Sequence, residues 1–290
     1  MAAKGLRYQY ARLNIAEKLI AINVAVFIIN YLVPFLLRWH PSAFEQWFWL
    51  PKGFLDFFSQ PWSIVTYSFF HGNFWHILMN MLILYYVGRI LLNLFDPKKF
   101  LNIYFLGVIS GGLAFLLSSN IFPAFLENTL PMVGASAGVM AVLLFVCTYM
   151  PNQEVRLFVF NIKLWYIGAF FVLKDLIQLP MGNAGGHIAH LGGAILGYFY
   201  ARQLAEGRDI GAGFSKFIDG LSNMFNTKEK KAPMKTVYKN KASVRTTKSK
   251  REKDINQRQI DDILDKISKS GYESLTKAEK DFLFKAGKED

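Results

Sequence analysis

The chain has 290 residues, of which 52% are hydrophobic and 16% aromatic, with a formal net charge of +12. Charged residues make up 19%, below the quarter that is usual in soluble domains, and this excludes an ordinary soluble globular protein. The single cysteine, Cys147, excludes an internal disulfide framework and any metal site built from several cysteines.

Most of the chain before residue 205 is apolar and predicts a membrane domain. A helix needs about 20 apolar residues to cross a bilayer. The first apolar run is long and lacks a small-residue cleavage site, so we expect a span there and not a cleavable signal peptide. Prolines punctuate the connections between six predicted spans. These spans are 17–38, 72–95, 99–119, 133–150, 164–181 and 185–205.

Basic residues alternate between the connections and orient these spans. They occur before the first span, between the second and third, and between the fourth and fifth, whereas 120–132 and 182–186 have none. By the positive-inside rule, both termini are expected on the cytoplasmic side, with 1–16 as the cytoplasmic N-terminus. The membrane is expected to be a bacterial-type plasma membrane. The connection 39–71 is rich in aromatic residues, so we expect it to lie in or dip into the outer leaflet.

Residues 206–254 predict an amphipathic and basic linker. Residues 228–253 carry eleven Lys or Arg against two Glu, a pattern typical of a solvated linker that attracts anionic inner-leaflet lipid. Nucleic-acid binding is not expected, because the run lacks interleaved stacking aromatics. Before it, apolar residues at helical spacing indicate a helix on the inner membrane surface or, equally, an ordinary helix packed on the tail. These residues are Phe214, Phe217, Ile218, Leu221 and Phe225.

The last segment, 255–290, predicts a small helical hairpin. Thr276 and Glu279 have the spacing of a capping box that opens its second helix. The first helix carries one apolar stripe, made of Ile260, Ile263, Leu264 and Ile267.

Four of the five histidines lie at the starts of the second and sixth spans, and Ser136 lies near the start of the fourth. The expected topology puts these three starts on the same, outer side. Polar side chains at membrane depth are costly and mark functional sites. Each residue also has a structural alternative: a small packing residue for Ser136, a loop cap for His71, and helix–helix contact for Asn80.

Residues 61–205 resemble the rhomboid family of intramembrane serine proteases. The resemblance implies a six-transmembrane-helix rhomboid-like bundle and a serine endopeptidase without cofactor or metal. It further implies cleavage of transmembrane segments of membrane-protein substrates near the outer leaflet. The motifs that carry it are Pro61-Trp62, His71, His76-x-x-x-Asn80, Gly134-x-Ser136, and Ala189-His190-x-x-Gly193 with Gly197.

The resemblance also implies the role of each site residue. Ser136 is the nucleophile and His190 the general base and acid of a dyad without an acidic third member. His76, Asn80 and the Ser136 backbone N–H form the oxyanion hole. The remaining positions support the site: His71, Gly134, Gly193 and Gly197. Glycine at 193 and 197 lets the sixth span approach the fourth closely.

His187 is a rival for the general base, but the glycine three residues beyond His190 favours His190. The chain departs from the family pattern at Ala137 and Met140, where many members have glycine and an aromatic residue. These departures bear on the orientation of His190 and not on the reaction class. Near the outer end of the fifth span, Lys174 and Asp175 are interpreted as interfacial anchors in preference to a paired polar edge.

Two other functions remain open. A non-proteolytic rhomboid-like scaffold would bind membrane helices and would not need the serine or the histidine. A metalloprotease or metal transporter would use the histidines, but no H-E-x-x-H motif occurs and no carboxylate is expected beside the histidine clusters.

Overall fold

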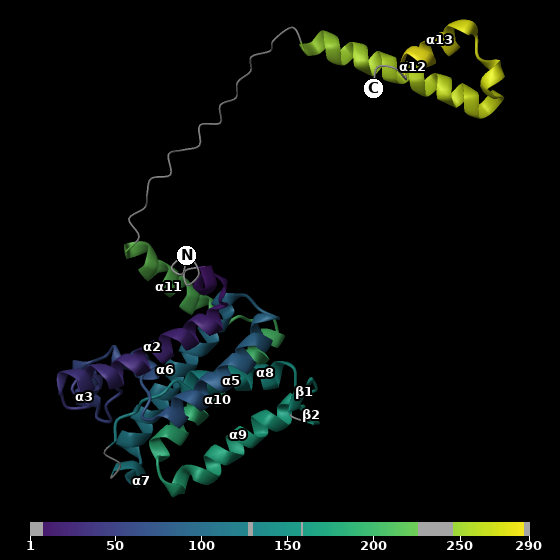
Figure 1. Cartoon of the computed structure of the whole chain (residues 1–290). Helices are drawn as coiled ribbons and strands as arrows, with labels where there is room; N and C mark the ends of the chain where they lie inside the picture. Colours follow the sequence, from purple (N-terminus) through teal and green to yellow (C-terminus); the bar gives the residue numbers. More distant parts are fainter. Residues whose placement is uncertain (1–7, 127–129, 158, 226–245, 287–290) are drawn as a thin grey trace. The chain divides into compact units, whose positions relative to one another are not determined.

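The structure is a computed structural model that describes residues 8–126, 130–157, 159–225 and 246–286 (Figure 1). The chain divides into two compact units, Met1–Thr227 and Lys228–Asp290. The first unit is a helical bundle, and the second is a pair of helices joined by a short turn.

A helix of the first unit lies over each of the six predicted spans. Two of these helices fall short of the length or apolar content of a typical span. They are α8 (Ser136–Tyr149), which has 14 residues, and α10 (Ala184–Ala205), which is rich in glycine and histidine. Four are long and apolar enough to cross a membrane: α2 (Ile15–Leu37), α5 (Phe74–Leu92), α6 (Pro97–Ile121), and α9 (Leu164–Gln178) with η3 (Leu179–Met181). The chain is therefore a mostly helical, multi-pass membrane protein, and six spans remain a prediction.

Helix α8 forms the centre of the bundle. Eleven of its 14 residues are buried, and α5, α6, α9 and α10 pack around it. A helix that is apolar on every face is expected where other helices enclose it. The segment that begins with Ser136 is thus the most enclosed helix among those the structure describes.

Small residues allow α6 to approach α8 closely. A β-carbon added to Gly107 would lie 2.2 Å from the β-carbon of Ala141, and one added to Gly111 would lie 2.4 Å from that of Ala137. Larger side chains at these crossings would push the helices apart. Close backbone packing of this kind promotes helix association in a bilayer, where lipid tails remove the hydrophobic driving force between helices.

Polar caps fix where α2 and α5 begin. Asn14 and Glu17 form reciprocal hydrogen bonds of 2.9 Å between side chain and backbone. At the start of α5, the Asn73 side chain accepts a hydrogen bond of 2.9 Å from the backbone N–H of His76. Such caps typically stabilise a helix by about 1 kcal/mol. The second cap also fixes the turn that carries His76.

The aromatic connection 39–71 is folded into four short helical turns. These are η1 (Glu45–Trp47), α3 (Phe54–Ser59), α4 (Ser63–Thr66) and η2 (Tyr67–Phe69). Backbone hydrogen bonds pair Leu50 with Met132, and the Asn30 amide donates to Glu45 at 2.9 Å. Several rings remain exposed, including Trp39, Trp47, Phe58 and Trp62. Their position in the outer leaflet stays a prediction.

A two-stranded antiparallel hairpin, β1 (Glu154–Leu157) with β2 (Phe160–Lys163), joins α8 to α9. The sequence predicts an all-α membrane protein; the structure is mostly helical, and this short hairpin is an element that the prediction did not include. Strands of four residues are too short for an alternating pattern to stand out in the sequence.

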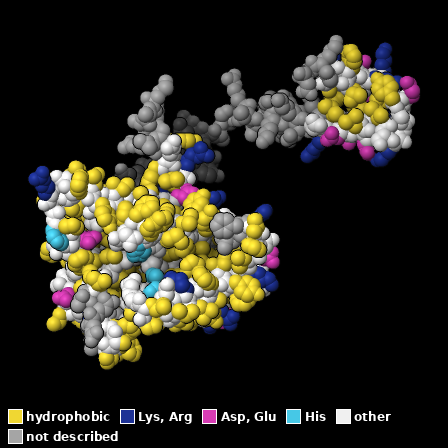
Figure 2. Space-filling view, turned by 60° about the horizontal axis from the view of Figure 1, so that its bottom comes forward, with side chains coloured by type: hydrophobic (Ala, Val, Ile, Leu, Met, Phe, Trp, Pro, Cys, Tyr) yellow, Lys and Arg dark blue, Asp and Glu magenta, His cyan; other side chains and the backbone are white. Residues whose placement is uncertain are grey.

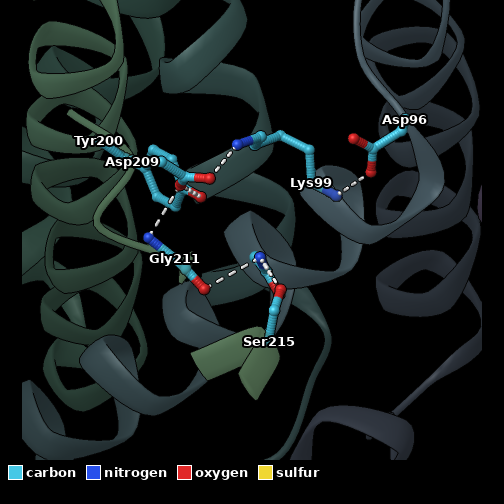
Figure 3. Close-up of polar contacts among 7 residues, drawn as sticks. Asp96, Lys99, Tyr200, Asp209, Gly211 and Ser215 are labelled. Atoms are coloured by element: carbon cyan, nitrogen blue, oxygen red, sulfur yellow. Dashed lines mark hydrogen bonds and ion pairs between the residues drawn. The ribbon is translucent and has the colours of Figure 1, made fainter. Parts of the chain in front are cut away.

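A polar cluster ties the chain beyond α10 to the start of α6 (Figure 3). Asp209 accepts hydrogen bonds from the Tyr200 hydroxyl at 2.6 Å and the Gly211 N–H at 3.0 Å, and it pairs with Lys99. Partial burial opposes ionisation, but the bonds from Lys99 and Tyr200 outweigh it and lower the pKa of Asp209. The cluster fixes the direction in which the chain leaves the bundle.

Helix α11 (Ala212–Phe225) packs on α6 through polar side chains. Asn102 donates to Ser215 at 2.6 Å, and Lys98 forms an ion pair of 2.9 Å with Asp219. Phe217 is 61% exposed. Helix α11 thus contacts the bundle through polar side chains and leaves an apolar side chain exposed. This arrangement favours the interpretation of α11 as a helix on the membrane surface. Contact of the basic tail with lipid stays a prediction, and residues 226–245 of that tail lie outside the described residues.

The second unit consists of α12 (Thr246–Ser270), η4 (Tyr272–Ser274) and α13 (Lys277–Ala286). Helix α12 begins inside the segment predicted to be linker. Leu264 is 51% exposed, unlike the buried Ile263, and it does not belong to the predicted apolar stripe. Thr276 and Glu279 form the reciprocal hydrogen bonds of the predicted capping box.

Acid is expected to destabilise this second unit through Glu279. A side-chain bond from Lys266 (2.9 Å) and bonds from Thr276 lower the pKa of Glu279 from 4.5 to about 2. Because the folded pKa is depressed, the stabilisation is present above about pH 4.5 and is lost as the pH falls towards 2. Hydrogen-exchange protection factors of α13, measured in the full chain, should fall over this window.

The control for this prediction is Glu279→Gln, which should remove the pH dependence. Added salt should weaken the effect, because the Glu279 side chain is partly exposed to solvent and its charge is therefore screened. An equal loss of protection in Glu279→Gln and the parent chain would assign the effect to another group.

Candidate active site

Ser136 is the first residue of α8, and the turn before it requires glycine. Gly134 has φ +128° and donates a backbone hydrogen bond of 3.0 Å to the Tyr67 carbonyl. A β-carbon there would lie 2.7 Å from the His76 ring and 3.5 Å from the Ser136 hydroxyl oxygen. Ser136 and His76 therefore flank the same glycine, and any larger residue would separate them.

The two histidines before and within α5 support this turn. The Ala135 N–H donates to His71 Nε2 at 3.4 Å, and the rings of His71 and His76 lie 5.1 Å apart, edge to face. Asn80, one turn beyond His76, is buried and donates to the His76 carbonyl at 3.0 Å. His71 thus contacts the loop that precedes Ser136, and its role at the site stays a prediction.

Two glycines bring α10 against the first turns of α8. A β-carbon on Gly193 would lie 2.1 Å from the Ala137 carbonyl oxygen, and one on Gly197 would lie 2.1 Å from that of Ala141. Gly111 meets both the Ala137 side chain and the Ala189 carbonyl. His190 follows Ala189 directly and lies one turn before Gly193, which contacts Ala137. His190 therefore lies near the end of α8 that begins with Ser136.

Ser136 and His190 do not form a hydrogen bond with each other among the described residues. The side chain of His190 is 19% exposed and that of His187 is 12% exposed. Figure 2 shows histidine side chains at the centre of a largely hydrophobic face of the first unit.

Asp175, on α9, is a site residue that sequence reasoning missed. Its side chain is fully buried and lies between the two histidines of α10. His190 Nδ1 lies 3.1 Å from each carboxylate oxygen, and His187 Nδ1 lies 2.8 Å from one of them. The interpretation of Asp175 as an interfacial anchor is therefore wrong, as is the expectation that no carboxylate joins the histidine clusters.

A physical signal for Asp175 was present in the sequence. An acidic residue near the end of an apolar helix has to find a partner, because burial of a lone carboxylate is costly. Helices α9 and α10 follow each other with a short connection, so the end of α9 lies beside the start of α10. Lys174 contributes too, with its ammonium group 3.0 Å from Asp175.

Asp175, His187 and His190 also have the donor set of a metal site. Their ligand atoms lie within 4.8 Å of one another. Carboxylate and imidazole groups are ordinary ligands of zinc. The distances above are those of hydrogen bonds, which account for the present contacts of the carboxylate without an ion.

The two departures from the family pattern are both buried in the bundle. Ala137 packs its methyl group where Gly111 of α6 leaves room, and its carbonyl contacts Gly193 of α10. Met140 is also buried in α8. Neither residue blocks the approach of α10 to α8.

Fold and site together define a multi-pass membrane protein with a serine and histidines gathered inside a helical bundle. Comparison with known families identifies a rhomboid domain over residues 59–207, about half of the chain. The chain belongs to the rhomboid family, which includes intramembrane serine proteases, and the resemblance found in its motifs is confirmed. Residues 247–286 match a family of unknown function, DUF6576, which covers most of the described second unit.

Several curated proteins are similar to this chain. Rhomboid protein 1, mitochondrial, of Saccharomyces cerevisiae is 30% identical over 67% of this chain and 54% of that protein. RHOMBOID-like protein 12, mitochondrial, of Arabidopsis thaliana is 27% identical over 50% of this chain and 47% of that protein. Presenilin-associated rhomboid-like protein A, mitochondrial, of Danio rerio is 31% identical over 47% of this chain and 36% of that protein. The chain spans about half or less of the length of these relatives.

The names of these relatives overturn the expected location. The sequence predicts a bacterial-type plasma membrane, but the relatives are named as mitochondrial proteins. The prediction fails because basic connections orient spans relative to one another and do not identify the membrane. The multi-pass membrane character stands. The bundle has a basic-connection side, where the Lys- and Arg-containing connections lie, and an opposite side.

Proposed function

We propose that this chain is an intramembrane serine endopeptidase that cleaves transmembrane segments through Ser136 and His190. One observation carries the proposal: Ser136 and His76 flank Gly134, while glycine contacts hold the His190 segment against the same end of α8. The rhomboid family includes intramembrane serine proteases, and the chain retains the serine and histidine that such chemistry requires.

His190 would act as the base. A serine hydroxyl is a poor nucleophile until a neighbouring base removes its proton. Nδ1 of His190 is engaged by Asp175, which leaves Nε2 to accept the Ser136 proton. The same nitrogen would then return that proton to the amine that leaves the cleaved peptide bond.

The oxyanion formed during attack needs donors that are already in place. Ser136 begins α8, so the first backbone N–H groups of the helix have no intrahelical acceptor. Together with the His76 ring and the Asn80 amide, they would bind the oxyanion. Asn80 would first exchange its bond to the His76 carbonyl for one to the oxyanion. Loss of one such donor typically costs about 10²–10³ in rate.

Rhomboid-family intramembrane proteases act on transmembrane substrates, and the site supports the same substrate class here. A peptide bond inside a helix is protected, because its carbonyl and N–H are paired within the helix. The substrate segment should therefore carry helix-weakening residues at the end opposite the basic connections. Helix α9 offers an apolar surface for its approach, with Phe170, Leu173 and Ile177 exposed.

A serine-directed covalent inhibitor tests the nucleophile directly. Incubation of the purified full chain with a fluorophosphonate, followed by peptide mapping, should place the label on Ser136. A matched control is Ser118→Ala, because the Ser118 hydroxyl already donates to the Phe115 carbonyl and should not affect labelling. A folded chain that is not labelled at Ser136 would favour the non-proteolytic scaffold that binds membrane helices.

A further inference from the structure

Asp175 is a fully buried carboxylate within an apolar helix, and it has three polar neighbours. They are Lys174 on α9, and His187 and His190 on α10. Burial of a charge without good partners costs several kcal/mol, so a fold keeps such a group only where its contacts are well made. Both oxygens of Asp175 are engaged, and each of them lies within 3.1 Å of His190 Nδ1.

These contacts select the protonation state of the His190 ring. An ionised carboxylate only accepts hydrogen bonds, so the nitrogen that faces it must carry the proton. In a neutral imidazole the other nitrogen is then an acceptor. Nε2 of His190 is thereby left unprotonated, which is the state that a general base needs when it faces a serine hydroxyl.

We propose that Asp175 is a positioning residue that holds His190 in the Nδ1-protonated tautomer and stabilises the imidazolium formed when Ser136 loses its proton. The inference rests on the proposed protease function and adds an acidic member to the serine–histidine pair. Asp175 does not touch the substrate and does not itself take up the proton. In other serine proteases, a carboxylate on the same ring nitrogen acts in this way.

His187 shares the carboxylate and adds to its support. Its Nδ1 lies 2.8 Å from Asp175, and its ring lies 5.8 Å from that of His190, edge to face. A second donor leaves the carboxylate less free to rotate away from His190. The resulting bond pattern joins α9 to α10 beside the site, so the tautomer of His190 depends on how these two helices pack.

The direct test is the tautomer itself, measured by NMR on full-length protein labelled with ¹⁵N-histidine in detergent. His190→Ala identifies the His190 signals by their loss. In the parent chain, His190 should be protonated at Nδ1 and unprotonated at Nε2. In Asp175→Asn the amide can donate to Nδ1, and the proton should move to Nε2. An unchanged tautomer in Asp175→Asn would overturn the inference.

Kinetics provide the second readout. Asp175→Asn should lower kcat on the order of 10⁴, as expected when the base is held in the wrong tautomer, with KM nearly unchanged. The same exchange in Asp219→Asn, an exposed position on α11, should leave kcat as in the parent chain. A kcat for Asp175→Asn within about twofold of the parent would also overturn the inference.

These outcomes separate the inference from the function on which it rests. If the parent chain neither cleaves substrate nor labels at Ser136, the proposed function fails, while the tautomer measurement still reports on Asp175. If the parent cleaves and Asp175→Asn does so equally well, only the positioning role fails. Loss of parental activity on treatment with a metal chelator would instead assign Asp175, His187 and His190 to a metal site and overturn the positioning role.

Discussion

Ser136→Ala is expected to abolish cleavage of a model transmembrane substrate reconstituted with the protein in liposomes. The variant lacks the only group assigned to attack the peptide bond. In serine proteases, loss of the nucleophile or of the histidine alone lowers kcat on the order of 10⁶. Activity should therefore fall below detection, as measured by the appearance of the two substrate fragments.

His190→Ala should have a similar effect, and the double variant should be no worse than either single one. Residues that act as one unit have strongly non-additive effects. Folding of each variant is checked by its melting temperature in detergent, which should stay close to that of the parent. Cleavage by a folded Ser136→Ala chain would assign the reaction to a different nucleophile.

Gly193→Ala is expected to disrupt the contact between α8 and α10. The added methyl group would lie 2.1 Å from the Ala137 carbonyl oxygen, a backbone atom that has no rotamer by which to move aside. Overpacking of a close-packed core typically costs about 1–3 kcal/mol. Because the helices must separate, His190 should also move away from Ser136. Both the melting temperature and the cleavage rate should fall.

The matched control is Gly220→Ala on α11, where a β-carbon meets nothing within 4 Å. This variant should keep the melting temperature and the cleavage rate of the parent chain. A Gly193→Ala chain with parental stability and activity would mean that α10 does not need its close approach to α8.

The sequence predicted the positions of the helices well, because their length and apolar content decide them. It also singled out Ser136, His76 and His190, since polar side chains are rare at membrane depth. The structure brings these three residues to one end of α8, although it does not test their roles. The number of membrane spans depends on α8 and α10, which are too short or too polar for composition alone to decide.

The sequence indicates that the carboxylate of Asp175 needs a partner, but it does not show which residue that partner is. The role of Asp175 depends on which side of α9 faces α10, and a helix with apolar residues on most sides gives no periodic signal for that. The same difficulty hid the hairpin of β1 and β2, whose strands are too short for alternation to be seen. The kind of membrane was predicted wrongly for another reason. The basic connections indicate how the spans are oriented, but they do not identify the membrane in which the spans lie.

The shortness of α8 has a consequence for the supply of water. Fourteen residues rise by about 21 Å, whereas the hydrocarbon layer is about 30 Å thick. If α8 ends near the basic-connection surface, its other end stops several ångströms beneath the opposite one. The space above it then belongs to loops and polar side chains instead of lipid tails. Under the proposed function, water would reach Ser136 through such a recess without any helix having to open.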